Sequence, residues 1–227
     1  ITDAKKRLTI ENRVKNLNDF KTLPRTFSKK IISVESNLFF FKHTPQDILE
    51  IAKKAKETQK YSFTTKNEKS LSIEIYRKIP LNIGFLLASL SHLDVASMEI
   101  FTLFDGIKYF KIEFIQNVKG SELVEVQEII DAAFDMERVV TLKAVNIKRE
   151  EINVDCNHSL THAEITIHTS NQLGLLAYVM HCFEELKINI ITAKIHSSKY
   201  KVRDSFLMDK QNDICNNVED IYAMLSK

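Results

Sequence analysis

The stretch from Ala163 to Met208 constrains the fold more than any other part of the sequence. Residues 163–167 alternate between apolar and polar side chains, which is typical of a strand with one buried face. Asn171–Gly174 is typical of a tight turn, and apolar residues then recur at helical spacing over 175–183. Residues 188–195 and 202–208 are again rich in strand-forming side chains. The stretch therefore predicts a strand, a tight turn, a helix and two further strands.

The turn between the first strand and the helix is the candidate binding element of this stretch. Gly174 allows a close approach of backbone or ligand. A helix that begins directly after it offers unpaired N–H groups and a partial positive charge. Such a turn suits a bound carboxylate.

A similar pattern precedes this stretch and indicates an internal repeat. Strands are expected at 71–75, 95–103, 107–115 and 139–147, with Asp105–Gly106 as a hairpin turn and helices over 82–91 and 122–137. Residues 93–100 align with 188–195. The second copy begins near Ile152 and ends in a helix over 214–225, so we expect Ile152–Val154 to take the place of its missing fourth strand. The prediction is an α+β fold in which each βαββαβ copy carries two helices on one face of an antiparallel sheet.

The first part of the chain is predicted to be helical. Thr44–Asp47 is a helix start with a capping threonine, a proline in the first turn and a favourable carboxylate. Thr58–Lys69 is polar and turn-like, and we place a boundary there. The predicted organisation is a helical lead-in over 1–65, a first repeat over 66–149 and a second repeat over 150–227.

Composition excludes several classes of protein. No apolar run approaches the roughly 18 residues of a membrane span, and no secretory signal peptide is evident. The net charge is +2, with +7 over residues 1–60 and −5 over the rest. The basic part is interpreted as a solvated helical surface, with a docking face for a missing part of a larger chain as the alternative. Cys156, Cys182 and Cys215 are far apart in sequence, which argues against a disulfide framework or zinc site and favours a reducing, cytoplasmic location.

Three segments resemble one family. TIHTSNQLGLLAYVMHCFEELKINIITAKI resembles an ACT domain, a ferredoxin-like βαββαβ module that binds amino acids. INVDCNHSLTHAEITI is similar to the lead-in of the last ACT domain of the PII uridylyltransferase/uridylyl-removing enzymes, and FFFKHTPQDILEIAKKAK resembles the segment before their first one. The resemblance implies two tandem ACT domains that sense glutamine in nitrogen metabolism and control nucleotidyltransferase domains upstream. Because the chain starts with isoleucine, we expect it to be part of such a longer protein.

The resemblance also implies ligand residues and partners. The expected site comprises the turn residues, one position on the second strand of the second repeat and its equivalent in the first: Asn171, Gln172, Leu173, Gly174, Leu175, Asn189 and Asp94. The sequence departs from the family where Asn171 replaces the common aspartate and the proline before the glycine is lost. Gly84 is too close to the following strand to match Gly174, so the first repeat is interpreted as degenerate at its ligand loop. Glutamine, the parent's catalytic domains, the PII signalling protein and a second copy of the chain are the expected partners.

The residues also leave other hypotheses open. Asn171 and Gly174 are equally compatible with a turn that binds nothing. No catalytic motif occurs, the histidines do not form a metal-ligand pattern, and no cofactor is expected in this chain. The strand order is shared with RNA-recognition domains, although adjacent Tyr109 and Phe110 must point to opposite faces. A ligand-free dimerisation module is the third alternative.

Overall fold

Strands and helices recur in one order in the computed structural model, which describes residues 2–210 and 214–226. The first repeat contains β1 (Tyr61–Asn67), β2 (Leu71–Arg77), α6 (Ile83–Ser89), β3 (Val95–Thr102), β4 (Lys108–Phe114) and α7 (Gly120–Ala132). The second contains β5 (Ile152–Asp155), β6 (His162–Ser170), α8 (Leu175–Glu185), β7 (Ile190–Lys194), β8 (Lys201–Asp209) and α9 (Val218–Leu225), with 3₁₀ turns at Arg149–Glu151 and Ile214–Asn216. The fold is α+β, and each repeat runs ββαββα.

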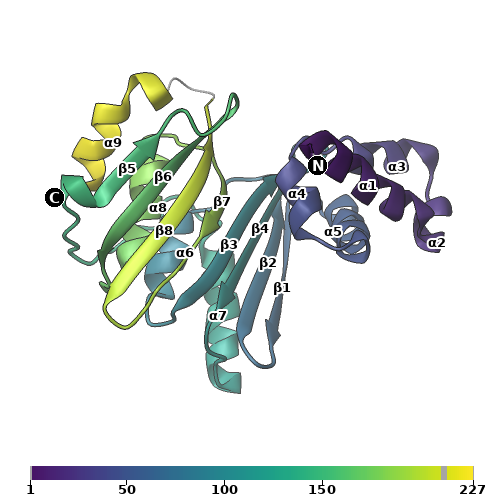
Figure 1. The fold of residues 1–227 in the computed structure, drawn as a ribbon. Helices are drawn as coiled ribbons and strands as arrows, with labels where there is room; N and C mark the ends of the chain where they lie inside the picture. Colours follow the sequence, from purple (N-terminus) through teal and green to yellow (C-terminus); the bar gives the residue numbers. More distant parts are fainter. Residues whose placement is uncertain (1, 211–213, 227) are drawn as a thin grey trace. The chain divides into compact units, whose positions relative to one another are not determined.

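The strands of the described chain form one eight-stranded antiparallel sheet (Figure 1). Its order is β1-β2-β4-β3-β7-β8-β6-β5. The strands of the second repeat therefore follow the order of the first in reverse, starting from the centre of the sheet. There, β3 and β7 pair with Met98 opposite Ala193. The two repeats are therefore joined edge to edge through equivalent strands.

The predicted order βαββαβ is wrong in one respect, because the fourth strand position is filled from the N-terminal side of each repeat. The edge strand β5 pairs with β6, as expected for Ile152–Val154. In the first repeat β1 takes this place, although Thr58–Lys69 was predicted as a polar turn. The side chains of β1 alternate between half-buried and exposed, so an edge strand can be polar on its outer face. Residues 139–147, predicted as a strand, contain none, because β1 already occupies the edge of β2.

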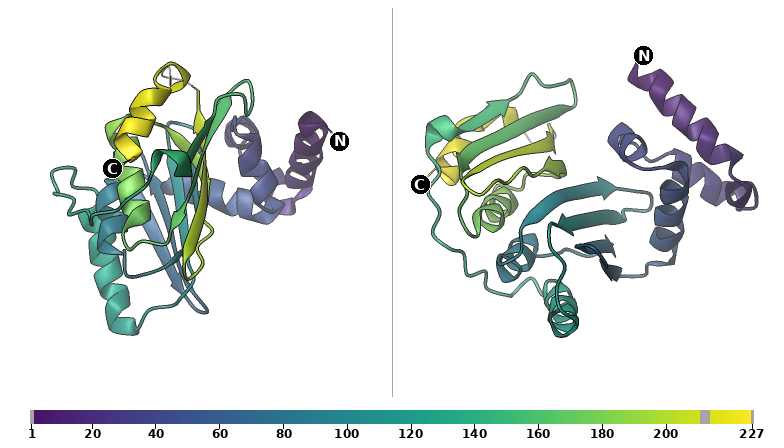
Figure 2. Two further views of the ribbon diagram at one scale, coloured as in Figure 1. Left: turned by 60° about the vertical axis from the view of Figure 1, so that its left-hand side comes forward. Right: turned by 60° about the horizontal axis from the view of Figure 1, so that its bottom comes forward.

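Helices α6 and α8 pack side by side against one face of the sheet (Figure 2). Gly84 makes this approach possible, since a Cβ atom built there would lie 3.1 Å from Glu184 Oε2 and 3.4 Å from His181 Cβ. Helix α6 has seven residues and α8 has eleven. The shorter helix explains why Gly84 could not be aligned with Gly174.

The chain divides into two compact units. One comprises residues up to Phe63 together with 75–78 and 101–110, and the other comprises the remaining residues. The helices of the first unit are α1 (Asp3–Asn16), α2 (Asn18–Lys21), α3 (Arg25–Ile32), α4 (Asn37–Lys42) and α5 (Pro45–Glu57). The predicted start of α5 is confirmed, with Thr44 and Asp47 forming a capping box.

An aromatic cluster forms the interior of this first unit. Phe39 and Phe40 on α4 are almost completely buried, and Phe39 contacts Phe101 edge to face at 5.6 Å. The His43 ring contacts the rings of Phe101 and Tyr109 edge to face. Asp105 and Gly106 adopt φ of 54° and 72°, which confirms the predicted tight hairpin turn.

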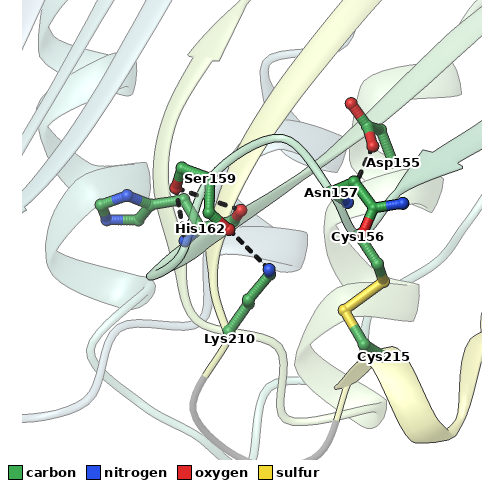
Figure 3. The surroundings of a disulfide bond; sticks show 7 residues. All are labelled: Asp155, Cys156, Asn157, Ser159, His162, Lys210 and Cys215. Atoms are coloured by element: carbon green, nitrogen blue, oxygen red, sulfur yellow. Dashed lines mark hydrogen bonds between the residues drawn. A yellow bond between two sulfur atoms is a disulfide. The ribbon is translucent and has the colours of Figure 1, made fainter.

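A disulfide bond joins Cys156, at the end of β5, to Cys215 in the 3₁₀ turn before α9 (Figure 3). The cysteine spacing had argued against a disulfide framework, and this expectation was therefore wrong. The two cysteines are 59 residues apart in sequence, but the return of the chain brings their Cα atoms to 5.9 Å. Cys182 is a buried free thiol. Disulfides are typical of oxidising compartments, so the argument that led to a reducing location no longer holds.

No helix in the described part of the chain is long and apolar enough to cross a bilayer.

Candidate ligand-binding site

A cavity of about 230 Å³ lies where the two repeats meet. The second repeat contributes the turn before α8 and the start of its first turn, together with residues from the ends of β7 and β8. The first repeat contributes the segment between α6 and β3. Sites of about 300–1,000 Å³ hold drug-sized molecules, so this volume suits a smaller metabolite.

The N-terminus of α8 forms one wall of the cavity. Gly174 adopts φ 85° and ψ 3°, the left-handed conformation that turns the chain into the helix. The Leu175 N–H donates to the Gln172 carbonyl, so this N–H group is not available to a ligand, although Leu175 was expected in the site. The N–H groups of Leu176 and Ala177, both wall residues, form no hydrogen bond with the described chain. The N–H groups at the start of α8 that have no partner in the described chain are therefore those of Leu176 and Ala177, further into the helix than Leu175.

Replacing Gly174 by alanine is expected to lower the free energy of unfolding by about 1–2 kcal/mol, because an L-residue is strained at positive φ. The added Cβ atom would also lie 3.2 Å from Lys143 Cβ. Gly120→Ala is the matched control: it begins α7, where a Cβ atom meets nothing within 4 Å. Urea denaturation should show no loss for the control. Equal effects at both positions would contradict the assigned role of the Gly174 turn.

The side chains of the turn are partly engaged by other segments. The Gln172 amide forms two hydrogen bonds of 2.8 Å with the backbone of Asn146, as donor to its carbonyl and acceptor from its N–H. Asn171 donates its amide to the Ser198 carbonyl at 3.0 Å. Leu173 is 56% exposed. Gln172 therefore anchors the segment before the second repeat, and Asn171 is fixed with its amide group at the cavity wall.

Asp204 supplies a carboxylate that the sequence analysis did not include in the site. It lies on β8 with Val202 and Phe206, on the buried face of the strand, and is only 4% exposed. One oxygen accepts a 3.1 Å hydrogen bond from the His196 N–H, the single hydrogen bond to this carboxyl group from described residues. Burial raises the pKa of Asp204 to about 6, although the bond from His196 opposes this shift. The alternation of residues 202–208 already predicts a buried carboxylate at this position.

Asp94 and Asn189 occupy equivalent positions in the two repeats but do not meet. Asp94 is an exposed residue that lines the cavity opposite the turn. Asn189 precedes β7, whereas Ile195, after the strand, lines the cavity. Six extended residues span about 20 Å, so Asn189 lies at the far end of β7. The structure thus brings Asp94, Asn171, Gln172, Leu173, Gly174 and Leu175 to one cavity and leaves Asn189 outside it.

The corresponding turn of the first repeat is closed by a protein side chain. The Glu184 carboxylate accepts hydrogen bonds from the Ile83 N–H at 2.9 Å and the Gly84 N–H at 3.3 Å, at the start of α6. These donors are therefore already paired with an anion. The start of the shorter helix α6 is therefore capped by a side chain of α8, and the degenerate ligand loop of the first repeat stays a prediction.

Two further features bear on the alternative hypotheses. Tyr109 and Phe110 are both buried, at 1% and 0% exposure, so β4 presents neither ring as a stacking platform for RNA. Within the described residues, no group of three or more histidine, cysteine, aspartate or glutamate side chains is arranged to hold a metal ion.

Comparisons with known proteins leave the family open. No protein-family model matches the chain, and no curated protein matches it. One similar solved structure is described as an unknown protein from Galdieria sulphuraria. It is 12% identical, the match covers 69% of this chain and 91% of that one, and the TM-score is 0.25. A similarity of this size supports no statement about fold or function.

Proposed function

We propose that this chain is an amino-acid-binding regulatory region built from two ACT-type domains. The observation that carries the proposal is the cavity between the repeats, where opposite charges are offered to one small ligand. Asp94 and Asp204 are the two ionisable side chains among its lining residues, and the start of α8 lies at the same cavity. An ammonium group would contact the aspartates, and a carboxylate would contact the N–H groups of Leu176 and Ala177.

The arrangement of the repeats supports the ACT-type assignment. Each repeat places two helices on a four-stranded antiparallel sheet, and equivalent strands β3 and β7 join the sheets. The site therefore draws its walls from both repeats, so an occupied cavity would stabilise their contact. A ligand that favours one arrangement of the repeats shifts the balance of states by its difference in affinity for them.

The resemblance of residues 166–195 to the ACT domains of the PII uridylyltransferase/uridylyl-removing enzymes makes L-glutamine the first ligand to test. In that proposal, binding controls uridylyl transfer and removal by catalytic domains in a longer chain, in the cytoplasm. The PII signalling protein and a second copy of this chain stay proposed partners. No resident cofactor is proposed.

A thermal-shift screen of the 227-residue chain against the free L-amino acids tests the binding step. At one hundred times its Kd, a ligand that binds only the folded state stabilises it by about 2.7 kcal/mol. A shift with glutamine supports the glutamine-sensing proposal, and a shift with another amino acid redirects its specificity. No shift with any amino acid contradicts the proposal.

Replacing Asp204 by asparagine should separate binding from stability. The raised pKa of Asp204, about 6, means that its protonated form is favoured on folding. The stability that protonated Asp204 contributes is thus fully present below about pH 4, and it is lost as the pH rises through 6. Without ligand, Asp204→Asn should raise the free energy of unfolding at pH 8 by about 2 kcal/mol, with little change at pH 4.

The same variant should lose the response to the amino acid at pH 8, because the amide removes the negative charge that faces the ammonium group. Asp209→Asn on the same strand, outside the cavity, is the control and should keep the response. An Asp204→Asn variant that is less stable at pH 8 and still binds would contradict the assigned role of this carboxylate.

A further inference from the structure

A second hollow, lined by other side chains than most of those in the cavity, lies at the end of β6 and the start of β8. Its volume is about 780 Å³. In the register of these strands His168 is paired with Arg203 and Ser170 with Lys201. Directly paired residues share a face of the sheet, and all four are exposed. His196, from the segment after β7, also lines this hollow.

The hollow has an excess of cationic and protonatable side chains. Within the described chain, the side chains of His168, His196, Lys201 and Arg203 form no ion pair or hydrogen bond, whereas the backbone N–H groups of His196 and Lys201 donate to Asp204 and Ser198. Glu151 is the one carboxylate in the lining, and its side chain already accepts bonds from the Lys148 N–H and the Thr169 hydroxyl. Lys201 and Arg203 lie two residues apart on the same face of β8, so an anion bound beside both would be stabilising.

We propose that this basic hollow, defined by His168, His196, Lys201 and Arg203, binds the phosphate groups of a nucleoside triphosphate. Arginine, lysine and serine side chains are ordinary donors to phosphate oxygens. The volume of the hollow lies within the range of small-molecule sites. Tyr200, which is 71% exposed, lies at the same hollow and offers a ring on which a base can stack.

This site is independent of the amino-acid cavity in its chemistry. The cavity presents aspartates and a helix N-terminus, whereas the hollow presents an arginine, a lysine and two histidines, and its one carboxylate, Glu151, already accepts hydrogen bonds from Lys148 and Thr169. The two share Ser197 and Val202 in their walls, and Asp204 and Arg203 are neighbours on β8 with opposite orientation. The region would thus bind an amino acid and a nucleotide on the two faces of one strand.

Isothermal titration calorimetry at fixed ionic strength tests the proposal, with ATP, inorganic tripolyphosphate and adenosine as probes. ATP and tripolyphosphate should bind and adenosine should not. Arg203→Gln and Lys201→Gln should each weaken ATP binding about tenfold, since each removes a charged hydrogen bond. Tyr200→Ala should weaken ATP but leave tripolyphosphate unchanged.

Lys66→Gln is the matched control, because Lys66 is an exposed lysine on the opposite edge strand, β1. It should bind ATP like the parent. Absence of tripolyphosphate binding, or an equal loss in Lys66→Gln and Arg203→Gln, would overturn the proposal. Tighter binding of polyglutamate than of ATP would also overturn it and assign the hollow to an acidic protein surface.

Discussion

Replacing Cys156 by serine should lower the free energy of unfolding by about 4 kcal/mol, the largest effect expected of any single substitution considered. The disulfide to Cys215 closes a loop with a sequence separation of 59 residues. Without it the unfolded chain gains the conformational freedom of that loop, while the folded chain loses the connection between β5 and the turn before α9. Denaturation in urea, followed by circular dichroism under oxidising conditions, measures the difference.

The controls for this substitution come from the bond itself. Cys215→Ser should cause the same loss, and the double variant should lose no more than either single one, because both remove one interaction. Reductant should lower the stability of the parent chain to that of the variants and leave the variants unchanged. A parent chain that is insensitive to reductant would show that the bond does not form.

Arg7→Met should destabilise the N-terminal helices by about 3 kcal/mol, since it leaves buried acceptors unpaired. The Arg7 guanidinium donates to the Ile32 carbonyl at 2.8 Å, to the Val34 carbonyl at 2.9 Å and to Glu11 at 2.6 Å. It also stacks over the Phe40 ring at 3.4 Å, and its side chain is only 13% exposed. One side chain therefore ties α1 to the end of α3 and to α4.

Arg13→Met on the same helix provides the comparison. Arg13 is exposed, so its replacement should change stability by less than about 0.5 kcal/mol. Hydrogen exchange is the suitable measurement, because it reports the opening of α1, α3 and α4 separately from the sheet. Equal protection in the two variants would show that the Arg7 contacts contribute nothing beyond a surface charge.

The parts of the fold that follow from local pattern could be predicted from the sequence. The strand, turn and helix from β6 to α8 were expected because apolar spacing and a turn glycine act within a few residues. The same holds for the capping box of α5 and for the Asp105–Gly106 turn. In each case the physical cause lies inside the segment that it shapes.

Features that depend on distant partners could not be predicted in this way. Residues 139–147 contain strand-forming side chains, yet they form no strand, and the edge of β2 that they were expected to occupy is taken by β1. The pairing of Cys156 with Cys215 and the capping of α6 by Glu184 each join segments far apart in sequence. Only the assembled chain determines which edges, caps and thiols meet.

The candidate site lies between these two cases. The turn from Asn171 to Leu175 and the opposing Asp94 were expected at one site, and all of them line the cavity. Asn189 was placed there by the resemblance to amino-acid-binding ACT domains, but the mirrored arrangement of the repeats puts it at the other end of β7. Asp204 was not expected at the site, although its alternation with Val202 and Phe206 places it on the buried face of β8.

The most direct test of amino-acid binding is a nuclear magnetic resonance titration of the ¹⁵N-labelled chain with L-glutamine and then with the other amino acids. We expect saturable shifts of the Gly174, Leu176 and Ala177 amides together with amides next to Asp94, because both repeats line the cavity. Resonances that do not move with any amino acid, or that move only outside these two segments, would contradict it.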